Sequence, residues 1–256
     1  MKSKITIVTV TYNAANVIEN TILSVVSQTY KSIEYIIIDG GSNDETSSII
    51  EKYNNYIKIY ISEPDNGIYD AMNKAVDIST GEWILFLNSG DIFVDENVLS
   101  KIFDVNEDLS RDQVIYGDTL LKYPWGIHRN VGRLFSKNDI CLPFCHQSVF
   151  VRTELMKKYK FDLSYKIVAD YNFFYKLYLS GAKFNHVDIL ISIYDMEGFS
   201  SRKVKESYEE IARINGTYGT VQYYKKKIYL SIRKVIFILL PSSLIEKIRK
   251  VKRILD

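Results

Sequence analysis

Short runs of consecutive apolar residues alternate with segments of helical periodicity along the first third of the chain. The apolar runs predict strands buried on both faces, because they lack the polar alternation of a half-exposed strand. The segments between them place apolar residues three and four positions apart, which predicts amphipathic helices. The strands are predicted over residues 5–12, 33–38, 57–61 and 83–87, and the helices over residues 17–27, 45–53 and 68–79. This alternation predicts right-handed crossovers and an α/β fold with a mostly parallel central sheet flanked by helices.

The pattern is less regular after residue 91. We expect a helix over residues 95–105, a short strand over 113–116, an aromatic-rich loop over 120–133, a short helix over 154–158, a helix over 167–180 and a strand over 187–193. No internal repeat or low-complexity linker interrupts the sequence. At 256 residues, the chain is long enough for one large α/β domain or two small ones.

Polar residues follow each of the first four predicted strands at the point where the strand ends. They are Thr11-Tyr12-Asn13, Asp39-Gly40-Gly41, Glu63-Pro64-Asp65 and Asn88-Ser89-Gly90-Asp91. Because the carboxyl ends of parallel strands meet at one edge of a sheet, we expect a nucleotide site there, with Asp39 bonding the base or ribose. No G-x-G-x-x-G follows the first strand and no G-x-x-x-x-G-K-[ST] occurs, which argues against a dinucleotide site and a P-loop.

Charge is distributed unevenly along the chain. Residues 202–256 contain 14 lysines and arginines against 5 acidic residues, a net charge of +9. The whole chain carries +2, which leaves −7 for residues 1–201. An acidic body with a basic tail indicates a carboxylate-bearing site and an anionic surface as a partner.

The chain has two cysteines, Cys141 and Cys145. With His146 they form C-x3-C-H, a weak zinc pattern, because no second Cys/His pair lies nearby. We favour two ordinary buried thiols in a reducing cytosol, since two cysteines make no disulfide framework. The strand-like ITIVTV begins at Ile5 without a small-residue cleavage site, so we expect no signal peptide and a cytoplasmic location.

From Tyr223 onward, basic clusters alternate with isoleucine, leucine and phenylalanine. The apolar run over residues 235–240 is too short to span a bilayer. A second basic helix is predicted after Pro241, where SLIEKIRKVKRIL places apolar residues along one face. Two such segments predict a tail that lies on the inner face of the cell membrane and is attracted by anionic lipid. The alternative is a tail that packs on the domain and leaves its basic face in solvent.

Five segments resemble the pattern of glycosyltransferase family 2, the nucleotide-sugar transferases of the GT-A fold. They are TVTYNAANVIENTILSVVSQTY, IEYIIIDGGSNDET, NGIYDAMNKAV, TGEWILFLNSGD and VADYNFFYKLYLSG, in family order over roughly residues 4–200. IDGGSNDET and FLNSGD are most similar to bacterial enzymes that assemble surface polysaccharide or O-antigen. The resemblance implies a GT-A domain over residues 1–205, with a nucleotide-binding half (1–118) and an acceptor and catalytic half (119–205). A basic amphipathic helical tail (206–256) follows.

The resemblance also implies roles for individual residues. Thr11, Tyr12 and Asp39 match positions that hold the uracil and ribose of a UDP donor. Asp170 matches the acid of the family's E-D motif, which is the general base. The residues expected to bind the nucleotide sugar are Thr11, Tyr12, Asn13, Asp39, Gly41, Asp65, Gly67, Asn73, Asn88, His146 and Gln147. For His146 and Gln147, a hydrogen-bonded loop pair without a site role is the alternative.

The family's D-x-D motif, whose carboxylates hold Mn²⁺ or Mg²⁺ against the donor diphosphate, corresponds to residues 88–91. The motif is usually D-x-D-D, whereas this chain has Asn88, Ser89, Gly90 and Asp91. Two carboxylates are missing, and the usual metal contact is a glycine. Asp91, with Asn88 as a neutral oxygen ligand, would still suit a hard cation that keeps several waters and binds phosphates. We therefore expect Asp91 to be the metal ligand and leave dependence on Mn²⁺ or Mg²⁺ open.

The resemblance implies an inverting enzyme that moves one sugar from a nucleotide sugar, with UDP favoured, to a hydroxyl of a glycan or lipid-linked acceptor. Asp170 would take the acceptor proton as the hydroxyl attacks. The Q-x-x-R-W motif of processive relatives is absent, so one transfer per encounter is expected. No nucleic-acid partner is expected. Tyr123, Trp125 and residues 198–202 would form a lid that excludes water.

Two alternatives remain open from the sequence. A sugar nucleotidyltransferase usually carries a Gly-rich, Arg-containing loop after the first strand, and TYNAANVIEN lacks it. A non-catalytic relative at the membrane would bind nucleotide without turnover, which the reduced motif at residues 88–91 allows. Asp170 argues against this second alternative, because no folding role for it is evident.

Overall fold

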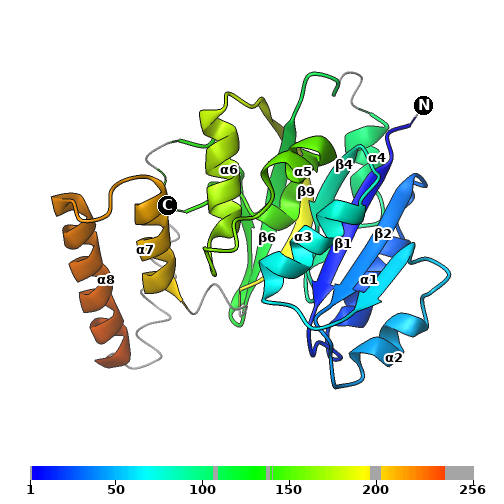
Figure 1. Ribbon diagram of the computed structural model, residues 1–256, viewed down its shortest axis with the longest axis horizontal. Helices are drawn as coiled ribbons and strands as arrows, with labels where there is room; N and C mark the ends of the chain where they lie inside the picture. Colours follow the sequence, from blue (N-terminus) through cyan, green and yellow to red (C-terminus); the bar gives the residue numbers. More distant parts are fainter. Residues whose placement is uncertain (1, 106–108, 137–138, 140, 197–202, 240–256) are drawn as a thin grey trace.

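The computed structural model describes residues 2–105, 109–136, 139, 141–196 and 203–239 (Figure 1). Within these residues the strands form one sheet in the order β3-β2-β1-β4-β8-β6-β9-β5, and β7 pairs with β6. The strands are β1 (Ile5–Thr11), β2 (Ile33–Asp39), β3 (Ile59–Ser62), β4 (Trp83–Phe86), β5 (Ile92–Phe93), β6 (Val114–Tyr123), β7 (Gly126–Asn130), β8 (Val149–Arg152) and β9 (Phe184–Asp195). β1 to β4, β6 and β9 run in one direction, whereas β5, β7 and β8 run in the other.

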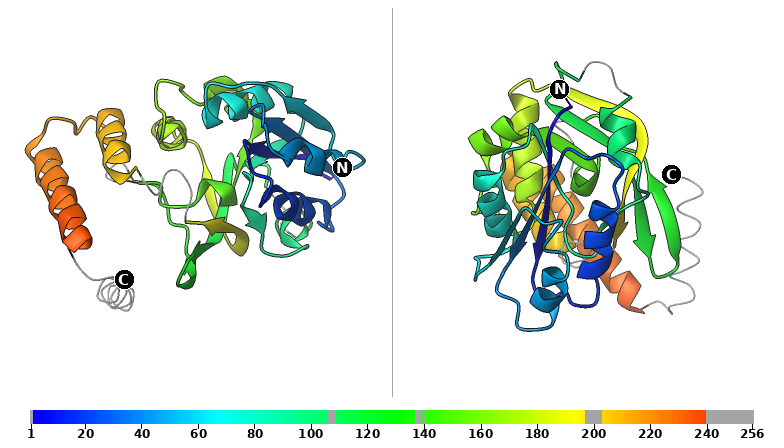
Figure 2. Two further views of the ribbon diagram at one scale, coloured as in Figure 1. Left: turned by 90° about the horizontal axis from the view of Figure 1, so that it is seen from below. Right: turned by 90° about the vertical axis from the view of Figure 1, so that its right-hand side faces the viewer.

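Helices cover both faces of this sheet, as Figures 1 and 2 show. They are α1 (Ile18–Val26), α2 (Thr46–Glu51) and α4 (Val98–Phe103) on one face, and α3 (Ile68–Ile78), α5 (Thr153–Tyr159) and α6 (Ala169–Leu179) on the other. Successive side chains of β1 enter the two layers in turn: Ile7 packs in the α1 layer and Val8 in the α3 layer. Both faces are therefore buried, which explains the continuous apolar runs. The predicted α/β alternation is confirmed.

The region after residue 113 differs from the prediction. β6 extends well beyond its predicted end at residue 116 and pairs with β7 in an antiparallel hairpin. On its other edge β6 pairs with β9, with shifts of register on either side of Asp118. A Cβ on Gly117 would lie 2.5 Å from the carbonyl oxygen of Ile189, so glycine permits this close approach of the two strands. The predicted loop over residues 120–133 is wrong, because pairing with a distant strand holds its first half as strand.

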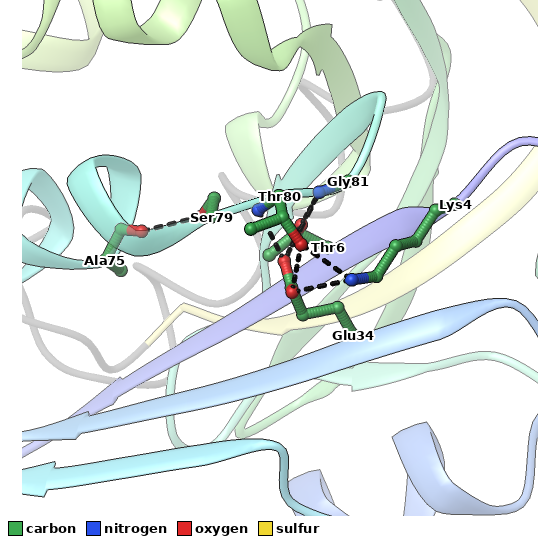
Figure 3. A network of polar contacts seen from close by, with 7 residues as sticks. All are labelled: Lys4, Thr6, Glu34, Ala75, Ser79, Thr80 and Gly81. Atoms are coloured by element: carbon green, nitrogen blue, oxygen red, sulfur yellow. Dashed lines mark hydrogen bonds and ion pairs between the residues drawn. The ribbon is translucent and has the colours of Figure 1, made fainter.

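A buried carboxylate joins the amino ends of three strands at the edge of the sheet where they begin (Figure 3). Glu34 of β2 accepts hydrogen bonds from Lys4 Nζ at 2.8 Å, Thr6 Oγ1 at 2.7 Å and Thr80 N at 2.7 Å. Burial alone raises the pKa of Glu34, but the hydrogen bonds from Lys4, Thr80 and Thr6 outweigh burial and lower it to about 2. This cluster stabilises the sheet at the edge opposite the strand-end residues identified above.

Two further helices, α7 (Val204–Ile214) and α8 (Val221–Leu239), lie to one side of the sheet (Figures 1 and 2). Ile211 of α7 belongs to the same core cluster as α6. α8 packs on α7 through the stacked rings of Tyr208 and Tyr223, whose centroids lie 5.6 Å apart. The expected boundary between residues 205 and 206 falls inside α7. Among the described residues, no helix has both the length and the apolar character that crossing a bilayer requires.

Two expected features lie outside the described residues. They are the loop over residues 198–202, expected to contribute to a lid, and the second basic helix after Pro241.

Candidate active site

Asp39 ends β2 at the carboxyl edge of the sheet, level with Thr11 of β1 and Ser62 of β3. Its carboxylate is fully buried and accepts hydrogen bonds from Ser62 Oγ at 2.6 Å, Ser42 Oγ at 2.5 Å and Ser42 N at 3.0 Å. These donors satisfy the buried charge and set its orientation. Thr11 Oγ1 is also buried and has no hydrogen-bond partner among the described residues. The edge therefore presents a buried hydroxyl that a ligand would satisfy.

Tyr12 and Asp65 approach each other across the backbone of Gly40. A Cβ on residue 40 would lie 2.6 Å from Asp65 Oδ2 and 3.4 Å from Tyr12 Cδ2. Asp65 Oδ1 accepts the N–H of Gly67 at 2.8 Å, and Gly41 adopts a φ of +79°, a conformation that favours glycine. The side chain of Tyr12 is 62 % exposed, so its ring is available for stacking with a ligand.

Asn13 joins the turns that follow β1 and β2. Its N–H donates to Ser42 Oγ at 2.8 Å, and its Oδ1 accepts the N–H of Asn43 at 2.9 Å. It also reaches the wall of the main cleft. Asn13 thus connects the row at Asp39 with the cleft.

Both ends of the Asn73 amide are used within the protein. Its Nδ2 donates to the carbonyl of Phe161 at 2.9 Å, and its Oδ1 accepts the N–H of Phe161 at 2.9 Å. Asn73 does not line the cleft, and neither do Thr11, Tyr12, Asp39, Gly41, Asp65 and Gly67. The structure uses both ends of this amide to hold the segment between α5 and α6.

The main cleft has a volume of about 1300 Å³ and is lined by the turn after β4 and by residues of β9, α3 and α6. Of the predicted site residues it brings together Asn13, Asn88, Asp91, His146, Gln147 and Asp170. Its apolar wall includes Ile68, Met72 and Leu142. Polar groups converging on a partly apolar concave wall are typical of a small-molecule site.

Asp170 lies in the first turn of α6 and points one oxygen at a fixed pair of donors. Its Oδ1 accepts the N–H of Tyr171 at 2.8 Å and lies 3.0 Å from Tyr69 Oη, whose single O–H is shared between Asp170 and the carbonyl of Ile167. Its Oδ2 lies 3.4 Å from His146 Nδ1. Burial, and then the charge of Asp170, raise the pKa of Tyr69 well above its usual value, so Tyr69 remains a donor.

His146, in the short 3-10 helix η1 (His146–Ser148), lies between Asp170 and the reduced motif after β4. Its Nε2 is 3.4 Å from Asn88 Nδ2, on the side of the ring away from Asp170. A neutral ring with its proton on Nδ1 would donate to Asp170 and accept from Asn88. All three residues were expected in the site from the sequence, but only the structure shows that they form one chain of contacts.

Asp91 and Asn88 supply the oxygen atoms that a hard cation would use. Burial raises the pKa of Asp91 to about 7, although His146, the N–H of Asp195 and the side chain of Gln147 each act to lower it. Asn88 Oδ1 is buried without a hydrogen-bond partner among the described residues. A carboxylate and an unsatisfied amide oxygen fit Mg²⁺ or Mn²⁺ held mainly by water and phosphate.

No cluster of three or more histidine, cysteine or acidic side chains suited to a metal ion occurs in the described part of the chain. The C-x3-C-H pattern therefore forms no such cluster, and Cys145 Sγ donates to Gln147 Oε1 at 2.7 Å. Cys141 is exposed, so the prediction of two buried thiols is wrong for Cys141, whereas burial raises the pKa of the Cys145 thiol.

Tyr123 and Trp125, which were expected in a lid, stack on each other at the β6–β7 turn, with centroids 5.0 Å apart. Neither residue is among those that line the cleft. The part of this hairpin that reaches the cleft is Leu121, Lys122 and Asn130.

The groups that orient Asp39 and Asp170 are not among the site residues expected from the sequence. Ser42 and Ser62 bond Asp39, and Tyr69 bonds Asp170. Ser42 and Tyr69 lie inside two of the matching segments, IDGGSNDET and NGIYDAMNKAV, which is the signal that could have pointed to them.

Two solved structures with bound nucleotide sugars have a similar fold. Chains of TarS (residues 1–349) from S. aureus in complex with UDP-GlcNAc match with a TM-score of 0.68 and 22 % identity, over 83 % of this chain and 65 % of TarS. The mannosyltransferase PcManGT from Pyrobaculum calidifontis, in complex with GDP-Man and Mn²⁺, matches with a TM-score of 0.60 and 16 % identity, over 90 % of this chain and 65 % of that one. This chain therefore spans less than two thirds of either structure. The fold is that of GT-A glycosyltransferases.

Relatives by sequence carry the same activity in their names. A PGL/p-HBAD biosynthesis glycosyltransferase of Mycobacterium tuberculosis is 29 % identical over 208 residues, which cover 77 % of this chain and 79 % of the relative. The sequence model described as Glycosyl transferase family 2 matches residues 6–165. The chain belongs to glycosyltransferase family 2, and the protein is a glycosyltransferase. Of the classes that the sequence left open, this one is confirmed.

Proposed function

We propose that the protein transfers a single sugar from a UDP-sugar to a hydroxyl of a glycan or lipid-linked acceptor, with inversion at the anomeric carbon. The observation that carries the proposal is the single cleft that holds both the reduced motif at Asn88 to Asp91 and the carboxylate of Asp170. One group at the leaving diphosphate and one base on the acceptor side are what direct displacement requires. The product would be a surface glycan, in keeping with the bacterial variants that the motifs resemble.

The donor nucleotide would lie along the row formed by Thr11, Asp39 and the exposed ring of Tyr12. The unsatisfied Thr11 Oγ1 and the oriented carboxylate of Asp39 support hydrogen bonds to a base or ribose. UDP is favoured because TarS, which shares the fold, is solved with UDP and with UDP-GlcNAc. GDP is the competing nucleotide, because PcManGT is solved with GDP-Man.

Asp170 would accept the proton of the attacking hydroxyl through Oδ2. Its Oδ1 is occupied by Tyr69 and Tyr171, so Oδ2 is the oxygen that remains for this task. His146, on the same side, would hold Oδ2 in the direction of the cleft while the acceptor enters.

A divalent cation would neutralise the charge that develops on the diphosphate, and Asp91 and Asn88 Oδ1 would hold it. The Mn²⁺ in the PcManGT complex supports a cation in this fold. Where the cation is weakly held, Asn88 and the N–H groups of the turn after β4 would bear more of the stabilisation.

The tail would attach the enzyme to the inner face of the cell membrane. On α8, Val221, Tyr224, Ile228 and Ile232 are exposed and follow one another along one face, and Lys225 is exposed beside them. Exposed apolar side chains next to lysines suit an interface that contains anionic lipid. A lipid-linked acceptor would then reach the cleft from the membrane surface.

Isothermal calorimetry of UDP, GDP and dTDP, with and without Mn²⁺, tests the donor site on wild type and on Asp91→Ala. Tight binding of UDP alone, weakened in the variant when Mn²⁺ is present, is the expected result. Metal-independent binding equal in both proteins would remove the cation from the proposal. Absence of binding by all three nucleotides would overturn the donor site.

Sedimentation with vesicles tests the tail. Wild type should bind phosphatidylglycerol vesicles and leave phosphatidylcholine vesicles largely unbound. Lys225→Glu with Lys226→Glu should weaken the binding roughly tenfold or more, because each basic residue near the surface contributes about 1 kcal/mol. Lys157→Glu with Lys158→Glu, both exposed on α5, is the control for net charge, because it also changes the charge by two lysine-to-glutamate substitutions. Equal binding by all three proteins would contradict the membrane role.

A further inference from the structure

Glu210 of α7 holds the segment that leads into α6. Its Oε1 accepts the N–H of Lys166 at 3.1 Å, and its Oε2 accepts the N–H of Ile167 and of Val168, both at 3.1 Å. Three consecutive backbone donors are thus satisfied by one carboxylate. The segment ends at Val168, the residue that precedes α6, and Asp170 follows two positions later.

The same segment is held from the opposite side by α3. Tyr69 Oη donates to the carbonyl of Ile167 at 2.8 Å and lies 3.0 Å from Asp170 Oδ1. Lys166, Ile167 and Asp170 all line the cleft. Because the N–H groups and a carbonyl of one short segment are held from two sides, the start of α6 has little freedom to move.

The three acidic residues in the middle of α7 are used differently. Glu209 pairs with Lys227 of α8 at 2.6 Å, and Glu206 is exposed. Glu210 has no lysine or arginine within 4.0 Å among the described residues, and its carboxylate faces backbone N–H groups instead. Hydrogen bonds from N–H groups to a carboxylate are charge-assisted, and their loss costs more than that of neutral ones.

We infer that Glu210 is a positioning residue for Asp170: it holds residues 166–168 so that the Asp170 carboxylate faces the acceptor hydroxyl. The role of Asp170 as base rests on the proposed function, whereas the contact between Glu210 and the segment does not. α7 would therefore belong to the catalytic unit as well as to the tail. A small displacement of a catalytic group lowers the rate of the chemical step much more than it lowers affinity for the donor.

The test compares Glu210→Ala and Glu210→Gln with wild type, and uses Glu206→Ala as the matched control on the same helix. Hydrolysis of UDP-GlcNAc and of GDP-mannose gives kcat and KM, and hydrogen exchange reports the amides of residues 166–168. In Glu210→Ala we expect kcat to fall roughly tenfold to a hundredfold with KM changed less than about twofold. Exchange at these amides should rise roughly tenfold or more. Glu210→Gln keeps a carbonyl oxygen as acceptor, so its kcat and exchange rates should lie between those of Glu210→Ala and wild type. Glu206→Ala should match wild type in both.

Faster exchange with an unchanged kcat would overturn the positioning role, because Glu210 would then be structural only. Unchanged exchange would overturn the contact itself. Should Glu210→Ala fail to fold, the same two readouts on Glu210→Gln decide. If wild type hydrolyses neither donor and binds no nucleotide, the proposed function fails. The exchange comparison then still decides whether Glu210 holds residues 166–168.

Discussion

Two buried carboxylates at opposite edges of the same sheet have pKa values that are shifted in opposite directions. Glu34, where the strands begin, is 2 % exposed and accepts hydrogen bonds from several donors, which lower its pKa to about 2. Asp91, where β4 has ended, is 5 % exposed and has too few donors to offset burial, so its pKa is raised to about 7. Both side chains have little exposed surface, but Asp91 is enclosed more deeply and lacks, among the described residues, a lysine partner such as Lys4. The depth of burial and the donors together decide whether a buried acid stabilises the fold or stays ready for a cation or proton.

The same contrast extends to the surroundings of the two edges. At the edge with Glu34, a lysine, two threonines and backbone N–H groups satisfy the charge. At the edge with Asp91, Thr11 Oγ1 and Asn88 Oδ1 are buried without partners among the described residues. Unsatisfied buried groups cost stability, and these two lie among the candidate site residues, where a ligand would satisfy them.

Loss of the Asp170 carboxylate should lower turnover of the donor more than any other substitution named here lowers it. Asp170→Asn keeps the shape of the side chain but cannot accept a proton, so turnover of the donor should fall about a thousandfold. Nucleotide affinity by calorimetry should stay within about twofold of wild type. Asp162→Asn, in the segment before α6, is the control. If Asp170→Asn retains most of its turnover, Asp170 is not the base, and the contrast between a stabilising edge and a reactive edge is contradicted.

Asp91→Asn should stabilise the metal-free protein at high pH. The pKa of Asp91 is about 7 when folded against an ordinary 3.8, so the folded state binds this proton more tightly. Ionisation then costs stability increasingly as the pH rises from about 4 to 7, and by as much as about 4 kcal/mol above that range. Urea unfolding with EDTA at pH 5 and pH 8 measures the difference. If the stability difference between Asp91→Asn and wild type is the same at pH 5 and at pH 8, the raised pKa of Asp91 is contradicted.

Glu34→Gln should lower the free energy of unfolding, whereas Asp91→Asn should raise it. The pKa of Glu34 is about 2 when folded against an ordinary 4.5, so its stabilisation is present above pH 4.5 and is lost as the pH falls towards 2. At pH 7 the variant should lose about 3 kcal/mol, and the loss should shrink in acid. Urea unfolding at pH 7 and pH 3 measures it. Calorimetry should show unchanged nucleotide binding, since the site lies at the other edge.

Gly40→Ala should have the smallest effect on stability. Its Cβ would lie 2.6 Å from Asp65 Oδ2, the end of a side chain that can rotate away, so the cost should be about 1 kcal/mol or less. Nucleotide affinity should still fall, because Asp65 and Tyr12 would separate. Gly81→Ala, at the opposite edge, is the comparator: its Cβ would lie 2.6 Å from the backbone nitrogen of Thr6, so it should lose more stability than Gly40→Ala. A larger loss of stability in Gly40→Ala than in Gly81→Ala would contradict the assignment of a stabilising role to one edge and a binding role to the other.

The sequence by itself determined most of the first half of the fold and which strand ends meet at one edge. Apolar periodicity, which is local, predicted the strands and helices up to residue 103 except β5, which depends on pairing with the distant strand β9. The grouping of strand ends follows from parallel pairing. Asp39, Asp91 and Asp170 could be named in advance as candidates, because they lie at the end of a strand, in the turn after a strand and at the start of a helix within matching segments.

Tertiary structure alone decided how these residues are held and charged. Asn73 bonds Phe161 across 88 positions, and Glu210 bonds residues 166–168 across 42 to 44 positions. The β6–β7 hairpin, the contact between His146 and Asp170, and the raised pKa of Asp91 depend in the same way on partners from distant segments. Local periodicity encodes which residues face the core, but it carries no information about which distant group will face a given polar atom.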